Sequence, residues 1–194
     1  RMAGVPYSAG GIAATVTATR AASDDVLRTT IRSLLTEMHA GGTTTIEVKS
    51  GYGLDVATEQ RSVQLAAEVT DEVTFLGAHV VPTEFVGDPE GYVDLVCGDM
   101  LTACAPHSRW VDVFCDRGAF TVGQSRRVLQ AGISAGLRPR IHLAQLEPSN
   151  GVDMAVELDC ASADHLTFLS DHDIELLAAS NTVATLVPAA DFST

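Results

Sequence analysis

The stretch that decides the fold is residues 140–166, which read RIHLAQLEPSNGVDMAVELDCASADHL. It follows a loop that ends in Pro139, and because proline disfavours helix before it, residues 140–145 are predicted to form a strand. Apolar residues at helical spacing predict a helix over 151–158. The small residues of 161–166 predict a second strand. A strand, a helix and a second strand in succession form the repeating unit of a parallel α/β fold.

Two histidines close these predicted strands, His142 the first and His165 the second. In parallel α/β proteins the catalytic groups lie where strands end and the following loops begin. A neutral imidazole at such a position can bind a metal or move a proton. The alternative for either histidine alone is a partly buried side chain bonded to the backbone. Two histidines at equivalent positions of successive units favour a functional site.

The composition is that of a globular protein with one sizeable core, since 46% of the 194 residues are hydrophobic and 5% are aromatic. No apolar run approaches the roughly 20 residues of a membrane span. The N-terminus also lacks the basic and then apolar pattern of a signal peptide. We therefore expect a cytoplasmic protein that does not bind a membrane.

The net charge and the cysteines exclude further classes of partner and site. Lys and Arg number 12 against 25 Asp and Glu, for a formal charge of −13. We expect no nucleic-acid partner, because phosphate binding needs clustered basic residues. The cysteines contain no Cys-x-x-Cys pair and are expected to be reduced core residues: Cys97, Cys104, Cys115 and Cys160.

The rest of the chain alternates between predicted helices and strands. Ser23 is a predicted N-cap, with Asp24 and Asp25 in the first turn of its helix. The predicted helices cover 12–16, 24–40, 56–68, 92–103, 122–137, 151–158 and a segment that begins after Ser170. The predicted strands cover 43–49, 73–79, 111–116, 140–145, 161–166 and 182–188, with no closing helix after the last one.

This alternation predicts a parallel sheet with right-handed crossovers. Polar residues at the strand ends, and no glycine-rich phosphate loop, favour a partial (β/α)₈ TIM barrel over a doubly wound sheet. A complete barrel has eight strands and about 250 residues. We therefore expect residues 1–194 to form a single partial barrel domain in which the first and last barrel strands are missing.

Two further residues stand at strand ends. His79 closes the strand predicted over 73–79. Tyr52 follows the strand predicted over 43–49 and lies between glycines, which allow backbone angles that a bulky residue could not hold. The loop 50–54 therefore suits the presentation of one phenol to a ligand, with an ordinary turn as the alternative.

Motifs along nearly the whole chain resemble those of a known family. They are RMAG at 1–4 with Tyr7, TRAAS at 19–23, EVKSGYGL at 47–54, TFLGAH at 74–79, VDVFC at 111–115, His142 with Gln145 and Leu146, SADHL at 162–166 and TVA at 182–184. In this order they resemble imidazolonepropionase, an amidohydrolase-superfamily enzyme of histidine degradation. The order of several motifs is more specific than any one of them.

The resemblance implies an amidohydrolase-type barrel of which strands two to seven are present here. It implies a hydrolase that opens the ring of 4-imidazolone-5-propanoate with water, giving N-formimidoyl-L-glutamate, with one divalent metal, zinc or iron. In this superfamily the metal ligands come from His-x-His on strand one, a histidine on strand five and an aspartate on strand eight. His142 matches the strand-five ligand.

The same resemblance assigns roles to the other site residues. Tyr52 and His79 are expected to contact the substrate, and Tyr7 to line the pocket. Gln145 is expected to touch the substrate and take part in catalysis. His165 matches the strand-six histidine near the reacting water. These roles suit the chemistry, because a metal activates water and polarises a carbonyl while imidazoles pass protons and orient the ring.

Two alternatives remain from the sequence. One is another amidohydrolase-superfamily enzyme, a cytosine- or guanine-type deaminase or a cyclic amidase, which would share the barrel but not the loop 50–54. The other is a non-catalytic α/β remnant. We also expect this chain alone to lack activity, and to aggregate or form a homodimer through unpaired edges along 43–49 and 182–187.

Overall fold

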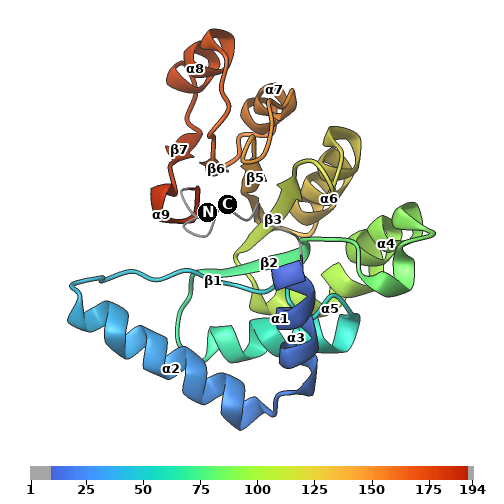
Figure 1. Ribbon diagram of the computed structural model, residues 1–194, viewed down its shortest axis with the longest axis vertical. Coiled ribbons are helices and arrows are strands. Elements are labelled where there is room, and N and C mark those ends of the chain that lie inside the picture. Colours follow the sequence, from blue (N-terminus) through green and yellow to red (C-terminus); the bar gives the residue numbers. More distant parts are fainter. Residues whose placement is uncertain (1–9, 192–194) are drawn as a thin grey trace.

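The computed structural model describes residues 10–191 and has an α/β fold built on one curled parallel sheet (Figure 1). In the described part of the chain the strands are β1 (Val48–Lys49), β2 (Val73–Ala78), β3 (Trp110–Cys115), β4 (Arg138–Pro139), β5 (Ile141–Leu143), β6 (Ser162–His165) and β7 (Val183–Thr185). The strand order is β1-β2-β3-β5-β6-β7, and β4 also pairs with β3, as an extension of β5 across Arg140. Strand order thus follows chain order, and the predicted partial barrel is confirmed as a half-barrel.

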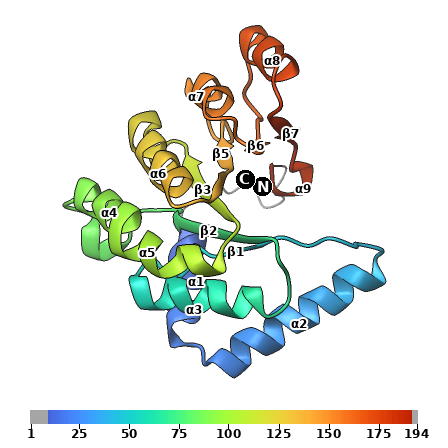
Figure 2. The same cartoon turned by 180° about the vertical axis from the view of Figure 1, so that it is seen from behind.

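The helices between residues 10 and 191 are α1 (Gly10–Ala21), α2 (Asp24–Ala40), α3 (Val56–Ala67), α4 (Pro89–Leu95), α5 (Leu101–Cys104), α6 (Val122–Ser134), α7 (Gly151–Glu157), α8 (Asp171–Ala178) and α9 (Pro188–Asp191). Shorter segments are η1 (Thr83–Phe85), η2 (Val96–Met100) and η3 (Ala105–His107). Figures 1 and 2 show α3, α6, α7 and α8 on the outer side of the curled sheet. The inner side is therefore left for the site.

Side-chain caps explain where several helices begin. Ser23 accepts a hydrogen bond from the backbone N–H of Val26, as its predicted N-cap role requires. Thr121 and Ser170 each form a capping box with the third residue of α6 and α8. The helix predicted over 92–103 begins earlier, at Pro89, and a π-helical turn, η2, interrupts it.

Both ends of the sheet differ from the sequence-based prediction. The strand predicted over 43–49 is only Val48–Lys49, because its neighbour β2 begins opposite Val48 and residues before it have no ladder partner there. The strand predicted over 182–188 is Val183–Thr185. A helical turn, α9, then follows where no closing helix was expected, and it begins at Pro188, a residue that favours the first position of a helix.

The sheet separates an apolar outer side from a polar inner side. Val111 packs against Gly132 of α6, where an added Cβ would lie 2.4 Å from the valine side chain. Side chains alternate along a strand, so Asp112 faces inward. Leu143 likewise lies beside Gly151 of α7, which turns His142 inward. Polar and ionisable side chains therefore gather inside the half-barrel.

The cysteines and the character of the helices can be compared with the expectations from composition. The cysteines are free thiols, and Cys104, Cys115 and Cys160 are buried. Over residues 10–191, none of the helices has both the length and the apolar character needed to cross a membrane.

Candidate active site

A cavity of about 740 Å³ opens at the C-terminal ends of the strands. Its lining includes five residues that were predicted from the sequence as site residues: Tyr52, His79, His142, Gln145 and His165. Four different strands supply them, since Tyr52 follows β1, His79 follows β2, His142 and Gln145 belong to β5 and its loop, and His165 ends β6. The sixth predicted residue, Tyr7, lies outside the described residues. The cavity lies at the end of the strands where barrel enzymes place their catalytic groups.

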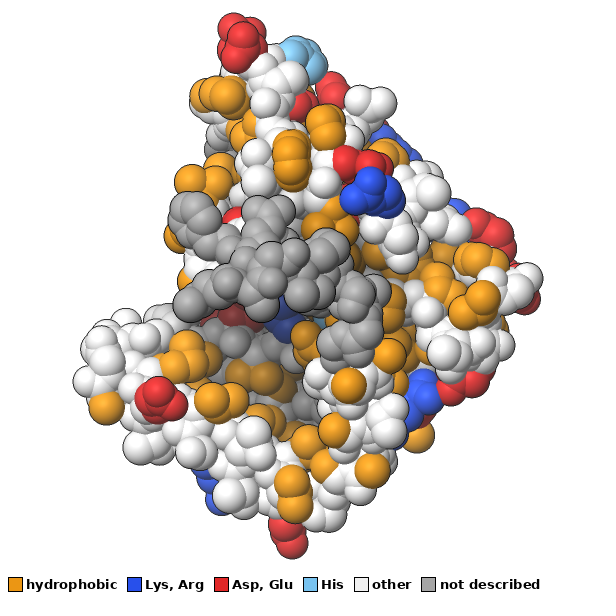
Figure 3. Space-filling model, in the orientation of Figure 1, with side chains coloured by type: hydrophobic (Ala, Val, Ile, Leu, Met, Phe, Trp, Pro, Cys, Tyr) orange, Lys and Arg blue, Asp and Glu red, His pale blue; other side chains and the backbone are white. Residues whose placement is uncertain are grey.

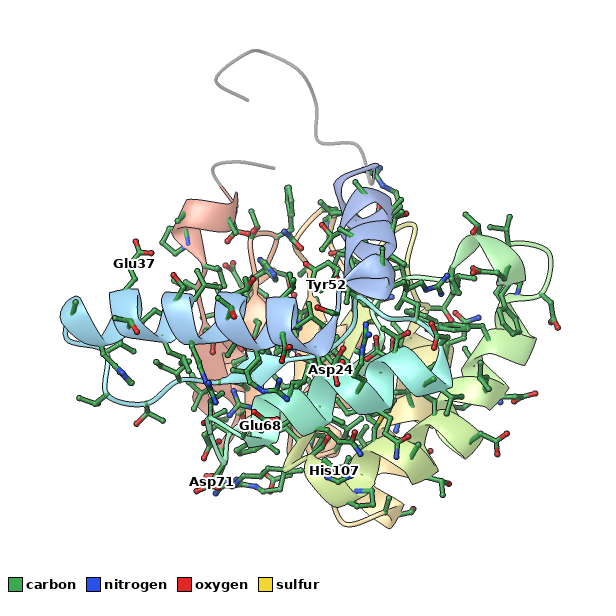
Figure 4. The ribbon with its side chains drawn as sticks, turned by 90° about the horizontal axis from the view of Figure 1, so that it is seen from below. Asp24, Glu37, Tyr52, Glu68, Asp71 and His107 are labelled. Atoms are coloured by element: carbon green, nitrogen blue, oxygen red, sulfur yellow. The ribbon has the colours of Figure 1, made fainter. Side chains whose placement is uncertain are left out.

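Tyr52 stands on a tightly folded loop after β1. Gly51 has a φ of +105°, and a Cβ there would lie 2.8 Å from the carbonyl oxygen of Leu76, so only glycine fits without a shift. The Tyr52 ring meets the His79 ring edge-on, with centroids 4.9 Å apart. Figure 4 shows Tyr52 close to α1, and Thr19 of that helix lines a small hollow with it.

His79 is held in one tautomer. Its Nδ1 lies 2.9 Å from the carbonyl oxygen of Gly51, which only accepts, so Nδ1 carries the hydrogen and Nε2 is left as an acceptor in the neutral ring. Burial lowers the pKa of His79, and His142 nearby lowers it further. A neutral His79 can therefore accept a hydrogen bond from a ligand in the cavity.

His142 belongs to a buried charged group inside the half-barrel. Its Nδ1 lies 3.0 Å from Oδ1 of Asp112, and the other oxygen of that carboxylate, Oδ2, accepts from Nζ of Lys49 at 2.8 Å. Burial would raise the pKa of Asp112, but His142 and Lys49 outweigh it, and the pKa is lowered. Burial alone would lower the pKa of His142, and Asp112 raises it overall.

Asp164 completes a group that could hold a metal. One ligand atom from each of Asp112, His142 and Asp164 lies within 4.8 Å of the others. Asp112 already bonds to Lys49 and His142, whereas Oδ1 of Asp164 is buried and has no hydrogen-bond partner among residues 10–191. With Nδ1 bonded to Asp112, Nε2 of His142 is the ring nitrogen left to bind a metal. His142 and Asp164 therefore fit a divalent ion, with Asp112 behind them.

His165 and Asp164 both reach the inner side although they are adjacent. His165 has a φ of +79° and Leu166 a φ of 56°, so the usual alternation of side chains breaks at the end of β6. Nδ1 of His165 lies 2.8 Å from Oδ1 of Asp191 in α9, and its ring centroid lies 5.3 Å from that of His142. His165 is 9% exposed.

Gln145 is placed by a second buried carboxylate. Oδ2 of Asp116 accepts from the backbone N–H groups of Gln145, at 2.8 Å, and Leu146, at 3.1 Å. Ala144 before them has a φ of 53°, which turns the chain sharply after β5. These contacts set the direction in which the Gln145 side chain leaves the loop towards the cavity.

Sequence reasoning missed the inner carboxylates and their cation: Lys49, Asp112 and Asp164. The signal was present for Asp112, which stands between two valines of a strand and must face away from the apolar side. Asp164 carried no such signal, because its neighbour His165 was expected to occupy the inner side.

A parallel half-barrel with ionisable side chains at the C-terminal ends of its strands has the layout of a (β/α)₈ barrel enzyme. The chain is 62% identical to the imidazolonepropionase of Mycolicibacterium smegmatis and 60% identical to that of Streptomyces coelicolor, each over all of its 194 residues. The imidazolonepropionase of Salinispora arenicola is 58% identical over 196 aligned residues. No family model matches the chain.

The chain is similar over its whole length to curated imidazolonepropionases, and the resemblance drawn from its motifs is confirmed. It spans about half the length of the curated relatives it matches, 49% to 50%. The expectation that the chain is an internal part of a longer sequence agrees with this coverage.

Proposed function

We propose that this chain is the strand-two-to-seven part of a hydrolase that opens the ring of 4-imidazolone-5-propanoate with water to give N-formimidoyl-L-glutamate. One observation carries the proposal: a single cavity is lined by Tyr52, His79, His142, Gln145 and His165. The similarity of the chain to curated imidazolonepropionases supports it. The reaction breaks a cyclic amide C–N bond in histidine degradation.

A divalent metal, zinc or iron, is part of this proposal. His142 would hold it through Nε2, and Asp164 belongs to the same group, with one carboxylate oxygen that has no hydrogen-bond partner among the described residues. When bound, such an ion lowers the pKa of water and polarises the carbonyl of the ring. Asp112 fixes the orientation of His142, as carboxylates do behind many histidine ligands.

The remaining residues divide between positioning and proton transfer. Neutral His79 and the Tyr52 phenol contact the ring, and the Gln145 amide bonds to its polar edge. His165 is the proposed proton carrier, because its Nδ1 bonds to Asp191 and its Nε2 is left for the reacting groups. Tyr7 is proposed as a further pocket residue.

The experiment is an assay of ring opening on the full-length protein that contains this chain, with the other half supplied by its own gene or by the Mycolicibacterium smegmatis relative. His142→Ala and His165→Ala should each remove most of the rate. His172→Ala is the matched control, because that side chain is 66% exposed on α8 and is not among the residues that line the cavity. Turnover of cytosine or guanine in place of imidazolonepropanoate would instead identify a superfamily deaminase.

Further parts of the proposal concern the chain as a whole. We propose a single partial barrel domain over residues 1–194, inactive alone and prone to pair as a homodimer. Its partner is a small-molecule substrate, with no nucleic acid or membrane involved. A cytoplasmic location suits an enzyme that degrades an amino-acid metabolite.

A further inference from the structure

Glu59 lies in the first turn of α3, behind the loop that carries Tyr52. Its exposed fraction is 0%, and its carboxylate accepts from the backbone N–H groups of Gly51 at 2.9 Å, Gly53 at 2.7 Å and Leu54 at 2.9 Å. Burying a carboxylate is costly unless several donors satisfy it. Here three amides of one short loop are those donors.

The loop needs such an anchor because its backbone is strained. Gly51 has a φ of +105° and Leu54 a φ of 57°, and the latter conformation is uncommon for a residue with a side chain. Gly53 packs so closely on α3 that a Cβ would lie 2.8 Å from the backbone nitrogen of Glu59. Three converging amides around one carboxylate hold this shape.

The anchored loop reaches the cavity through two aromatic rings. The carbonyl of Gly51 accepts from Nδ1 of His79, and the Tyr52 ring packs edge-on against the same histidine. Glu59 itself does not line the cavity. It therefore has no direct route to a ligand, and any effect on one must pass through the loop.

We propose that Glu59 is a positioning residue, which sets the ring geometry of Tyr52 and His79 and thereby the affinity for the substrate. This inference rests on the proposed function, in which these two rings contact the substrate. The alternative is a purely structural role, in which Glu59 only keeps α3 folded and has no effect on the substrate.

The test variant is Glu59→Gln in the full-length protein. Glutamine has nearly the same shape, but its amide nitrogen would face backbone donors and one or more of the three hydrogen bonds would be lost. KM should rise about tenfold while kcat changes less, because substrate contacts loosen and the groups that react stay in place. The peptide covering residues 50–55 should also exchange its amide hydrogens faster.

Val63→Ala is the matched control. Val63 lies one turn further along α3 and is fully buried in the core, so its truncation destabilises the protein while the hydrogen bonds between Glu59 and the loop amides keep their partners. It should lower Tm and leave KM and the exchange of residues 50–55 unchanged. If Glu59→Gln does not fold, Glu59→Asp is the second variant. It keeps the negative charge on a side chain one methylene shorter, so KM and the exchange of residues 50–55 should both rise, but by less.

The two measurements, KM and amide exchange of residues 50–55, separate this inference from the proposed function. Faster exchange of the loop in a protein without ring-opening activity would overturn the proposed function and leave the anchoring role in place. Unchanged KM and unchanged exchange in Glu59→Gln would overturn the positioning role. So would a KM shift of equal size in Val63→Ala, because the effect would then follow stability alone.

Discussion

Nδ1 of His142 lies 3.0 Å from a carboxylate oxygen of Asp112, a side chain with no exposed surface. Since a carboxylate only accepts, Nδ1 carries the hydrogen, and Nε2 of the neutral ring has a free lone pair. Lys49 donates a hydrogen bond to the other oxygen of Asp112 and stabilises the negative charge of this buried carboxylate. The sheet therefore presents His142 in the tautomer and orientation that a metal ligand needs.

Asp112→Asn should weaken metal binding in the full-length protein. The variant loses the charge that orients His142, and such changes typically cost about 10- to 100-fold in metal affinity. Metal content after dialysis against graded chelator would measure the loss. Asp153→Asn is the control, because that carboxylate is 61% exposed on α7. Equal metal retention in both variants would contradict the orienting role.

The isolated 194-residue chain should bind zinc weakly. A catalytic zinc site normally takes three protein ligands and water. Here Nζ of Lys49 lies 2.8 Å from Asp112 and 3.8 Å from Asp164, so its positive charge already offsets part of the negative charge of these two carboxylates. Calorimetry should detect no tight site, and Lys49→Met should tighten binding by uncovering the two carboxylates. A stoichiometric submicromolar site in the unaltered chain, abolished by His142→Ala, would show that this account of the ligands is wrong.

The histidine at the end of β2 should make stability depend on pH. Burial lowers the pKa of His79 in the folded protein, whereas the unfolded chain regains a value of about 6.5. As pH falls below about 6.5, the unfolded state takes up a proton that the folded state does not, so the free energy of unfolding decreases until the folded pKa is reached. Below that pH both states are protonated and His79 contributes no further loss.

Urea denaturation of full-length protein at about pH 7.5 and about pH 5.5 would measure this dependence. His79→Gln should reduce the loss of stability between the two pH values. His172→Gln, at an exposed site, should leave the loss unchanged. An identical loss in His79→Gln and the unaltered protein would exclude His79 as its source.

The sequence predicted the order of strands and the strand-end residues because both depend on local patterns. Alternating segments imply a parallel sheet, and His79, His142 and His165 can be counted from the ends of predicted strands. The limits of β1 could not be found this way, since residues 43–47 have strand composition but no neighbour in register.

The missed residues depend on contacts between segments far apart in the chain. Glu59 looks like an ordinary polar residue of an amphipathic helix, and its burial follows only from the way the loop before α3 folds back on it. Lys49 and Asp112 are 63 positions apart and meet because the sheet curls. No local pattern in the sequence carries that information.

The last prediction concerns the two ends of the sheet. Between residues 10 and 191, β1 pairs only with β2, and β7 pairs only with β6. The residues of β7 are exposed, with Val183 at 61%, and α2 has no buried residue among those described. Figure 3 shows hydrophobic side chains in orange on the part of this face formed by α2, at the lower left. Leu34 of that helix is 54% exposed. Unpaired strand edges and exposed apolar surface favour association.

We therefore expect the isolated chain to dimerise or aggregate and to lack ring-opening activity, whereas the full-length protein should be active. Light scattering beside the activity assay on both lengths tests this. Lys substitutions at Val183 and Leu34 should reduce association of the short chain, since a charge on an edge strand or an apolar helix face opposes pairing. These substitutions should not restore activity, because the metal would still lack its other ligands. A monodisperse and active 194-residue monomer would show that the remaining barrel strands are dispensable. It would also contradict the assignment of His142 as one of several metal ligands that come from different strands.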